Sequence, residues 1–158
     1  MNKTVLKFGL YALLSGALVF SAALLFGKSF PSSIEVAFGY ATMIIAVSFA
    51  YFGIKAYRDK ENNGTITFKK ALGIGVLISV FAGVGIGLID ALFTSIIYPD
   101  FAVEYAASLK EQGYEGEPPI YSSAQMALLM FVTVMIVGII VSIISAMILK
   151  TPQKSITN

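Results

Sequence analysis

Cysteine, histidine and tryptophan are all absent from this chain of 158 residues. Without cysteine and histidine, the chain cannot form disulfides, thiolate nucleophiles, histidine-bearing zinc sites or a Ser-His-Asp triad. Charge is also scarce, because charged residues make up 13% of the chain and the net charge is +2. So small a net charge argues against a partner such as nucleic acid. The sequence predicts no cofactor and no metal ion.

Apolar residues dominate instead, at 57% of the chain, and they gather in four runs with almost no charge. Each run is long enough to cross about 30 Å of hydrocarbon as a helix. The predicted spans are residues 8–26, 36–54, 71–97 and 126–149. The first run follows two lysines, as in a signal peptide, but it is longer than the usual apolar region of about 7–15 residues. The sequence therefore predicts an all-α integral membrane protein with a single transmembrane domain, residues 1–158.

Lysine and arginine are distributed unevenly among the segments that connect these spans. Nine of the eleven lie at the N-terminus, between the second and third spans, or after the fourth, and only Lys28 and Lys110 lie in the other two segments. By the positive-inside rule, both termini are predicted to face the cytoplasm. Tyrosines at the ends of the runs, such as Tyr40 and Tyr121 on the outer side, are typical of membrane interfaces.

Small residues recur at every fourth position along the third span. They are Ala71, Gly75, Ser79, Gly83, Gly87, Ala91 and Ser95. This spacing keeps them on one face of a helix, and small residues let membrane helices approach closely. The ridge predicts that the third helix is the centre of a four-helix bundle. The alternative is that the same ridge forms the seam of a homodimer.

Asp90 is the acid that lies within a predicted span. A carboxylate at the centre of a membrane helix costs roughly 2.5–3.5 kcal/mol, and less toward the interface. Since Asp90 lies beside Ala91 and three residues after Gly87, it is predicted to face the bundle interior in the outer third of the membrane. One interpretation is a polar contact with a partner at the same depth. The candidate partners are Ser21, Lys28, Tyr40, Thr94 and Gln125. The alternative is a protonatable or cation-binding residue in an outward-facing cavity.

Residues 98–123 form the longest segment outside the spans. Apolar positions in it recur at helical spacing. They are Ala102, Tyr105, Ala106 and Leu109. With Asp100 as a cap and Gly113 as a stop, the pattern predicts a short amphipathic helix on the outer surface or folded over the bundle. The acids of this segment show no metal-ligand spacing, and we interpret them as solvated.

The segment between the second and third spans, residues 55–70, contains the other candidate site residues. They are Tyr57, Arg58, Asp59, Lys69 and Lys70. Arginine and lysine could hold a phosphate group, and Asp59 could act as a base or metal ligand. The simpler interpretation is that the basic residues attract anionic lipid headgroups.

In that simpler interpretation each remaining feature of the segment has a structural role. The sequence Asn62-Asn63-Gly64 predicts a turn, because asparagine and glycine tolerate positive φ. Thr67 is predicted to cap the third helix. For Asp59 the pattern predicts an ion pair with Lys55 one turn earlier, or with Lys69 or Lys70 across the turn, so that it fixes the segment.

Three short motifs resemble a known family. They are Gly-Ile-Lys-x-Tyr-Arg-Asp at 53–59, Gly-x-Ile-Thr-Phe-x-x-Ala at 64–71, and Tyr-Pro-Asp-Phe at 98–101. Together they are similar to a family of short bacterial membrane proteins described as domain of unknown function 4199. The resemblance implies a four-helix protein of the bacterial inner membrane, and it implies no particular activity.

Three classes of function remain open from the sequence. The favoured one is a non-enzymatic protein that acts through helix packing or through binding lipid, a homodimer partner or another membrane protein. The second is a small transporter or channel subunit that uses Asp90. The third is a membrane enzyme acting on a lipid-linked phosphate at Arg58 and Asp59. A polar cavity at Asp90 would favour transport, and a groove at Arg58 would favour lipid chemistry.

Overall fold

A computed structural model describes residues 1–26 and 32–151 of the chain, and the elements are helical throughout these ranges. They are α1 (Asn2–Phe26), α2 (Ser32–Ala56) with its π-helical extension η2 (Tyr57–Glu61), α3 (Phe68–Leu92) with its extension η3 (Phe93–Ile97), α4 (Phe101–Glu111) and α5 (Ser123–Leu149). Four of them are long and apolar enough to cross a membrane. The predicted all-α class, the four spans and the short helix before the fourth span are confirmed.

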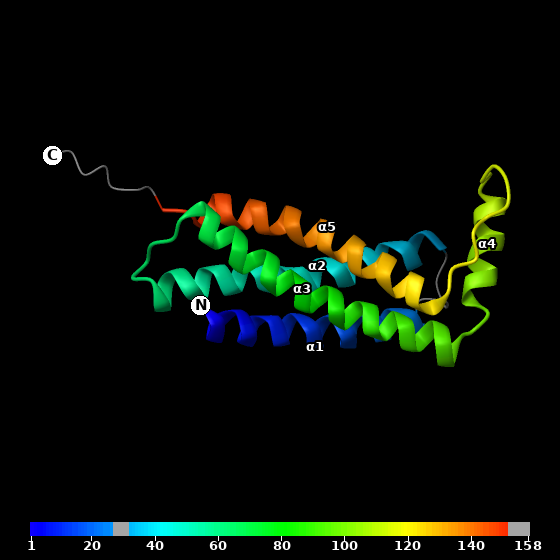
Figure 1. Cartoon of the computed structure of the whole chain (residues 1–158), viewed down its shortest axis with the longest axis horizontal. Coiled ribbons are helices and arrows are strands. Elements are labelled where there is room, and N and C mark those ends of the chain that lie inside the picture. Colours follow the sequence, from blue (N-terminus) through cyan, green and yellow to red (C-terminus); the bar gives the residue numbers. More distant parts are fainter. Residues whose placement is uncertain (27–31, 152–158) are drawn as a thin grey trace.

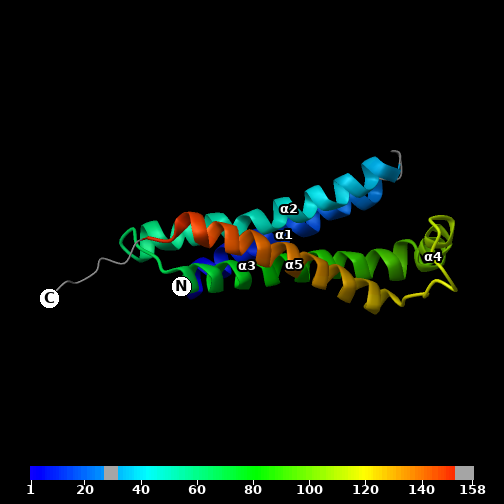
Figure 2. The ribbon, with the colours of Figure 1, turned by 90° about the horizontal axis from the view of Figure 1, so that it is seen from above.

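The four long helices run side by side, and α4 crosses one end of them (Figure 1). The start of α1 and the end of α5 lie at the opposite end. Helix α3 makes the most extensive contacts, chiefly with α5 and α1, and α2 likewise contacts each of the other long helices. Seen from above, α1 and α2 diverge from α3 and α5 toward the α4 end (Figure 2).

Every long helix extends beyond its predicted span. Helix α2 continues through the basic residues to Glu61, and α3 begins at Phe68. Tyr57, Arg58 and Asp59 therefore lie on a helix, and the prediction that they belong to a loop is wrong. The physical reason is that lysine, arginine and glutamate are good helix formers, so a loss of apolar character does not end a helix.

The small-residue ridge of α3 packs against α5 within the chain. A Cβ atom added at Gly83 would lie 2.8 Å from Cδ2 of Phe131, and one at Gly75 would lie 2.6 Å from Oγ of Ser142. In the opposite direction, a Cβ at Gly138 of α5 would lie 2.5 Å from Cβ of Ser79. The ridge thus brings two helices of one chain into close contact, as its spacing predicts for the centre of a bundle. Gly75, Ser79, Gly83 and Gly87 of the ridge are buried, whereas Ser95 at its far end is exposed.

Large apolar side chains cover the outer faces of the long helices. Exposed examples are Leu14 and Leu18 of α1, Ile44 of α2, Leu88 of α3, and Ile136 and Ile140 of α5. A water-soluble protein rarely exposes apolar surface of this extent, whereas lipid tails accept it. These faces are suited to contact with the bilayer.

The turn before α3 has the predicted geometry. Asn63 and Gly64 have φ values of 51° and 76°, and Thr67 is the N-cap of α3, where its hydroxyl accepts a hydrogen bond from the Lys70 amide at 3.4 Å.

Thr67→Ala removes the hydroxyl that accepts this hydrogen bond. We expect it to lower the free energy of unfolding by about 0.5–2 kcal/mol, measured by circular dichroism during reversible unfolding in mixed micelles. Thr67→Ser keeps the hydroxyl and is the control. An equal loss in both variants would contradict a capping role.

Candidate functional site

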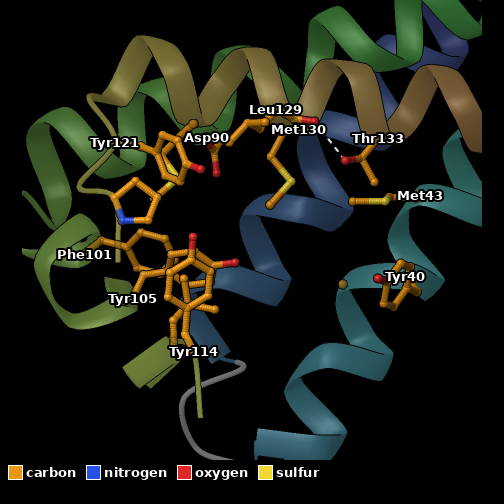
Figure 3. A pocket seen from close by; sticks show the side chains of 14 residues that line it. Tyr40, Met43, Asp90, Phe101, Tyr105, Tyr114, Tyr121, Leu129, Met130 and Thr133 are labelled. Atoms are coloured by element: carbon orange, nitrogen blue, oxygen red, sulfur yellow. Dashed lines mark hydrogen bonds between the residues drawn. The ribbon is translucent and has the colours of Figure 1, made fainter. Parts of the chain in front are cut away.

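A cavity of about 540 Å³ lies between α2, α3 and α5 at the end that α4 crosses (Figure 3). Its lining is mostly aromatic and sulfur-containing. The aromatic residues are Tyr40, Phe101, Tyr105, Tyr114 and Tyr121, and the methionines are Met43, Met126 and Met130. Tyr40, Tyr105 and Tyr114 remain exposed, so the cavity is open on their side. Its volume falls within the range of about 300–1,000 Å³ that is typical of small-molecule sites.

Aromatic contacts attach α4 to the end of α3. The Phe101 ring of α4 lies 6.4 Å from the buried Phe93 ring of η3, and it stacks on Tyr105 at 6.2 Å with an interplanar angle of 13°. Tyr98 completes the cluster, at 6.1 Å from both Phe93 and Phe101. These edge-to-face and stacked rings place Tyr105 on the cavity wall. Asp100 occupies the N-cap position of α4 but its side chain forms no capping hydrogen bond, so that predicted role is wrong.

The C-terminal end of α4 positions a further cavity residue. Gly113 has a φ of 89°, and the Tyr114 amide donates to the Leu109 carbonyl at 3.0 Å. This 6→1 hydrogen bond is that of a Schellman motif, in which glycine supplies the left-handed conformation. Gly113 thus ends the helix as predicted, and the turn directs the chain so that Tyr114 lines the cavity.

Asp90 of α3 reaches the cavity from the bundle interior. Its side chain points into the space, with the rings of Phe101, Tyr105 and Tyr114 on the opposite side (Figure 3). Only 3% of its surface is exposed, and its Oδ2 atom is buried without a hydrogen-bond partner among the described residues. A buried polar atom without a partner costs about 1–3 kcal/mol, and more if it is charged. The inward orientation of Asp90 is therefore confirmed, and a satisfied contact for this oxygen is not found.

Three of the five candidate partners of Asp90 bond elsewhere. Ser21 donates to the Ala17 carbonyl, and Gln125 forms a capping box with Ser122. Thr94 donates at 2.9 Å to the main-chain carbonyl of Asp90, not to its carboxylate. The prediction that one of these three satisfies the carboxylate is wrong. Each forms its hydrogen bond with a residue of its own helix or its cap.

The remaining two candidate partners of Asp90 are Tyr40 and Lys28. Tyr40 lines the same cavity as Asp90. Lys28 lies outside the described residues. In the segment 98–121 the sequence predicts an amphipathic-helix position for Tyr105 and an interface position for Tyr121. It does not predict that these two residues and Tyr114 line one cavity with Asp90. The concentration of four of the eight tyrosines in that segment was the available signal.

The candidate residues of the segment 55–70 make structural contacts at the end of the bundle opposite to the cavity. Arg58 Nε lies 2.7 Å from Asp59 Oδ1, and Arg58 Nη1 donates at 3.5 Å to the Leu149 carbonyl at the end of α5. The predicted pairing of Asp59 with Lys55, Lys69 or Lys70 is wrong, because its adjacent neighbour is the ion-pair partner. Lys70 Nζ lies 5.2 Å from the centre of the buried Tyr57 ring, a cation–π contact.

Further contacts tie this end together. Glu61 forms an ion pair of 2.6 Å with the terminal amine of Met1 and a hydrogen bond with Thr4. The amide of Thr151 donates to the Ile66 carbonyl at 3.0 Å, and the Ile66 amide donates to the Thr151 hydroxyl at 2.9 Å. Among the described residues, no group of three or more acidic side chains is placed to hold a metal ion. Glu61 and Ile66 thus bind residues at both ends of the described chain, Met1 and Thr151.

Comparison with known proteins identifies a family. The family model described as "Protein of unknown function (DUF4199)" matches residues 7–151. No curated protein and no solved structure matches the chain. The matched range includes Asp90, the aromatic residues of the cavity and the Arg58–Asp59 pair.

Proposed function

Since the chain belongs to the DUF4199 family, of unknown function, we propose that this multi-pass membrane protein is not an enzyme and binds a small amphipathic ligand in the cavity below α4. The observation that carries the proposal is the buried Oδ2 atom of Asp90, which has no partner in the described chain and borders a cavity large enough for a ligand. Apolar walls with one or a few polar groups are typical of ligand sites.

The distribution of basic residues supports a membrane orientation for this site. Lys3, Lys7, Lys150 and the basic residues at the end of α2, in η2 and at the start of α3 all lie at the end opposite to α4. With this end in the cytoplasm of a bacterial inner membrane, the cavity opens at the outer face. Lys154, which also contributes to the asymmetry, lies outside the described residues.

Two features favour ligand binding over the other functions considered. A protein that acted through helix packing alone would not need a cavity around an unpartnered acid, because packed interiors leave few voids larger than a water molecule. A lipid-phosphate enzyme would need Arg58 and Asp59 free, whereas each is engaged with the other and Arg58 also contacts Leu149.

Transport is the second candidate function, since an intramembrane acid in an outward-facing cavity is typical of transport pathways. Below the cavity, however, Val47, Ile86 and Val134 are fully buried and fill the space between the helices. Passage through the bundle would require these side chains to separate. Binding alone needs no such rearrangement, and uptake of the bound molecule into proteoliposomes would favour transport.

The proposal is tested by filling the cavity. Gly39 of α2 lines it, and a Cβ at this position meets no atom within 4 Å. Gly39→Trp should therefore place an indole in the cavity without straining the helices. We expect the wild-type protein, extracted in polymer discs with its native lipid, to carry a small molecule or lipid that the variant loses. Mass spectrometry of the extracted compounds measures this difference.

Gly73→Trp is the matched control. Gly73 also lies on a long helix with no atom within 4 Å of its Cβ position, but it does not line the cavity. This variant should keep the compound found in the wild type. Identical compound profiles in the wild type and Gly39→Trp would overturn the proposed function.

A further inference from the structure

The cavity has charge of one sign only. Among the described residues that line it, Asp90 is the one carboxylic acid, and none is lysine or arginine. In the described part of the chain Asp90 forms no ion pair, in contrast to Glu61 and Asp59 at the other end. A carboxylate held away from water favours any cation that enters, because Coulomb attraction is strong where the dielectric is low.

The aromatic side chains of the cavity have the complementary property. Tyr40, Tyr105, Tyr114 and Tyr121 all line it, and Phe101 stacks on Tyr105 within the same wall. The faces of aromatic rings attract organic cations, and groups of such rings are used to bind quaternary ammonium groups. The methionines among the lining residues add flexible, polarisable surface that adapts to an attached apolar group.

Resting on the ligand-binding function proposed above, we propose that the ligand carries an organic ammonium group, which lies against Asp90 between the tyrosine rings, and an apolar part that contacts the methionines. A metal cation fits less well, because the cavity offers a single carboxylate, whereas hard cations need several oxygen ligands. An anionic ligand is disfavoured by the buried acid. The ammonium group could belong to a free organic cation or to a lipid headgroup such as phosphatidylethanolamine.

Two molecules of nearly equal shape separate the role of charge from that of size. Benzyltrimethylammonium and neopentylbenzene differ in replacing the quaternary nitrogen by carbon, so that one is a cation and the other is neutral. Binding of each is measured by equilibrium dialysis with the full chain in phosphatidylglycerol nanodiscs, which contain no ammonium lipid. We expect the cation to bind more tightly by roughly 10- to 150-fold, the range expected for one charged contact.

Variants assign this preference to the site. Asp90→Asn should bind both molecules with equal affinity, Gly39→Trp should bind neither, and Gly73→Trp should behave as the wild type.

Adding phosphatidylethanolamine to the discs distinguishes the two sources of ammonium. If the lipid weakens binding of the cation, the native ligand is a lipid headgroup, and if it has no effect, the native ligand is a free cation. Both results support the proposal.

Three results would overturn it. Equal binding of both molecules to the wild type would mean that Asp90 acts as a neutral acid. Binding of the cation to Lys28→Ala but not to the wild type would mean that Lys28 neutralises Asp90. Binding of neither molecule, while the wild type still carries a compound that Gly39→Trp loses, would exclude this ligand class and leave the binding function standing. Loss of that compound difference as well would remove both proposals.

Discussion

Gly85→Val is expected to reduce the stability of the fold more than any other glycine substitution on α3. A Cβ at Gly85 would lie 2.5 Å from the carbonyl oxygen of Leu13 on α1 and 3.0 Å from its Cα. A side chain in the way could rotate, but these are main-chain atoms, so the two helices must separate. Overpacking of this kind typically costs about 1–3 kcal/mol, and occasionally more. Circular dichroism during unfolding in mixed micelles, with size-exclusion chromatography, measures the loss.

The control is Gly73→Val, which makes the same change in the same helix where no atom lies within 4 Å of the new Cβ. Because valine has a higher intrinsic helix propensity than glycine, this variant should keep or slightly gain stability. Helix propensity acts equally at both sites, so the difference between the two variants isolates the α1–α3 contact. Equal stabilities would show that α1 does not approach α3 as closely as the structure places it.

The same pair of glycines shows what the sequence could predict about the fold. The small residues at every fourth position from Ala71 to Ser95 predict that α3 approaches a neighbouring helix closely, and the glycines among them do so. Gly85 lies off that ridge and faces α1. A single glycine at a crossing has no periodic signal, and its partner, the Leu13 carbonyl, is a main-chain atom present in every residue. The pattern could therefore predict that α3 has a closely packed face, whereas the identity of its partners, α5 on the ridge and α1 at Gly85, required the packed structure.

In the candidate site, too, some features could be predicted from local spacing and others required the packed structure. That Asp90 faces inward could be predicted from its neighbours Gly87 and Ala91, because helix geometry fixes its direction. The tyrosine wall could not, since it depends on how α4 crosses the bundle. That crossing is set by the contact of Phe93 with Phe101, which lie on different elements and whose side chains follow no shared period. Local spacing predicts which face a residue occupies, and long-range packing decides what that face meets.

Asp90→Leu is expected to stabilise the protein while removing ligand binding. The carboxylate oxygen Oδ2 is buried without a partner, so its removal relieves a penalty of about 1–3 kcal/mol. Space for the larger side chain exists, because Asp90 borders the cavity. A gain in the free energy of unfolding together with a loss of bound compound would be typical of a residue kept for function at the expense of stability.

Thr94→Val provides the comparison, since it also replaces a buried polar group by an apolar one, one turn from Asp90. The Thr94 hydroxyl has an acceptor, the Asp90 carbonyl at 2.9 Å, so no unmet polar group is removed and no gain is expected. Breaking a buried ion pair by removing one partner destabilises by about 3–5 kcal/mol. Destabilisation of Asp90→Leu by that amount would therefore mean that a counter-charge, with Lys28 as the candidate, satisfies the carboxylate. The sign of this one measurement separates a carboxylate available to a ligand from one that holds the helices together.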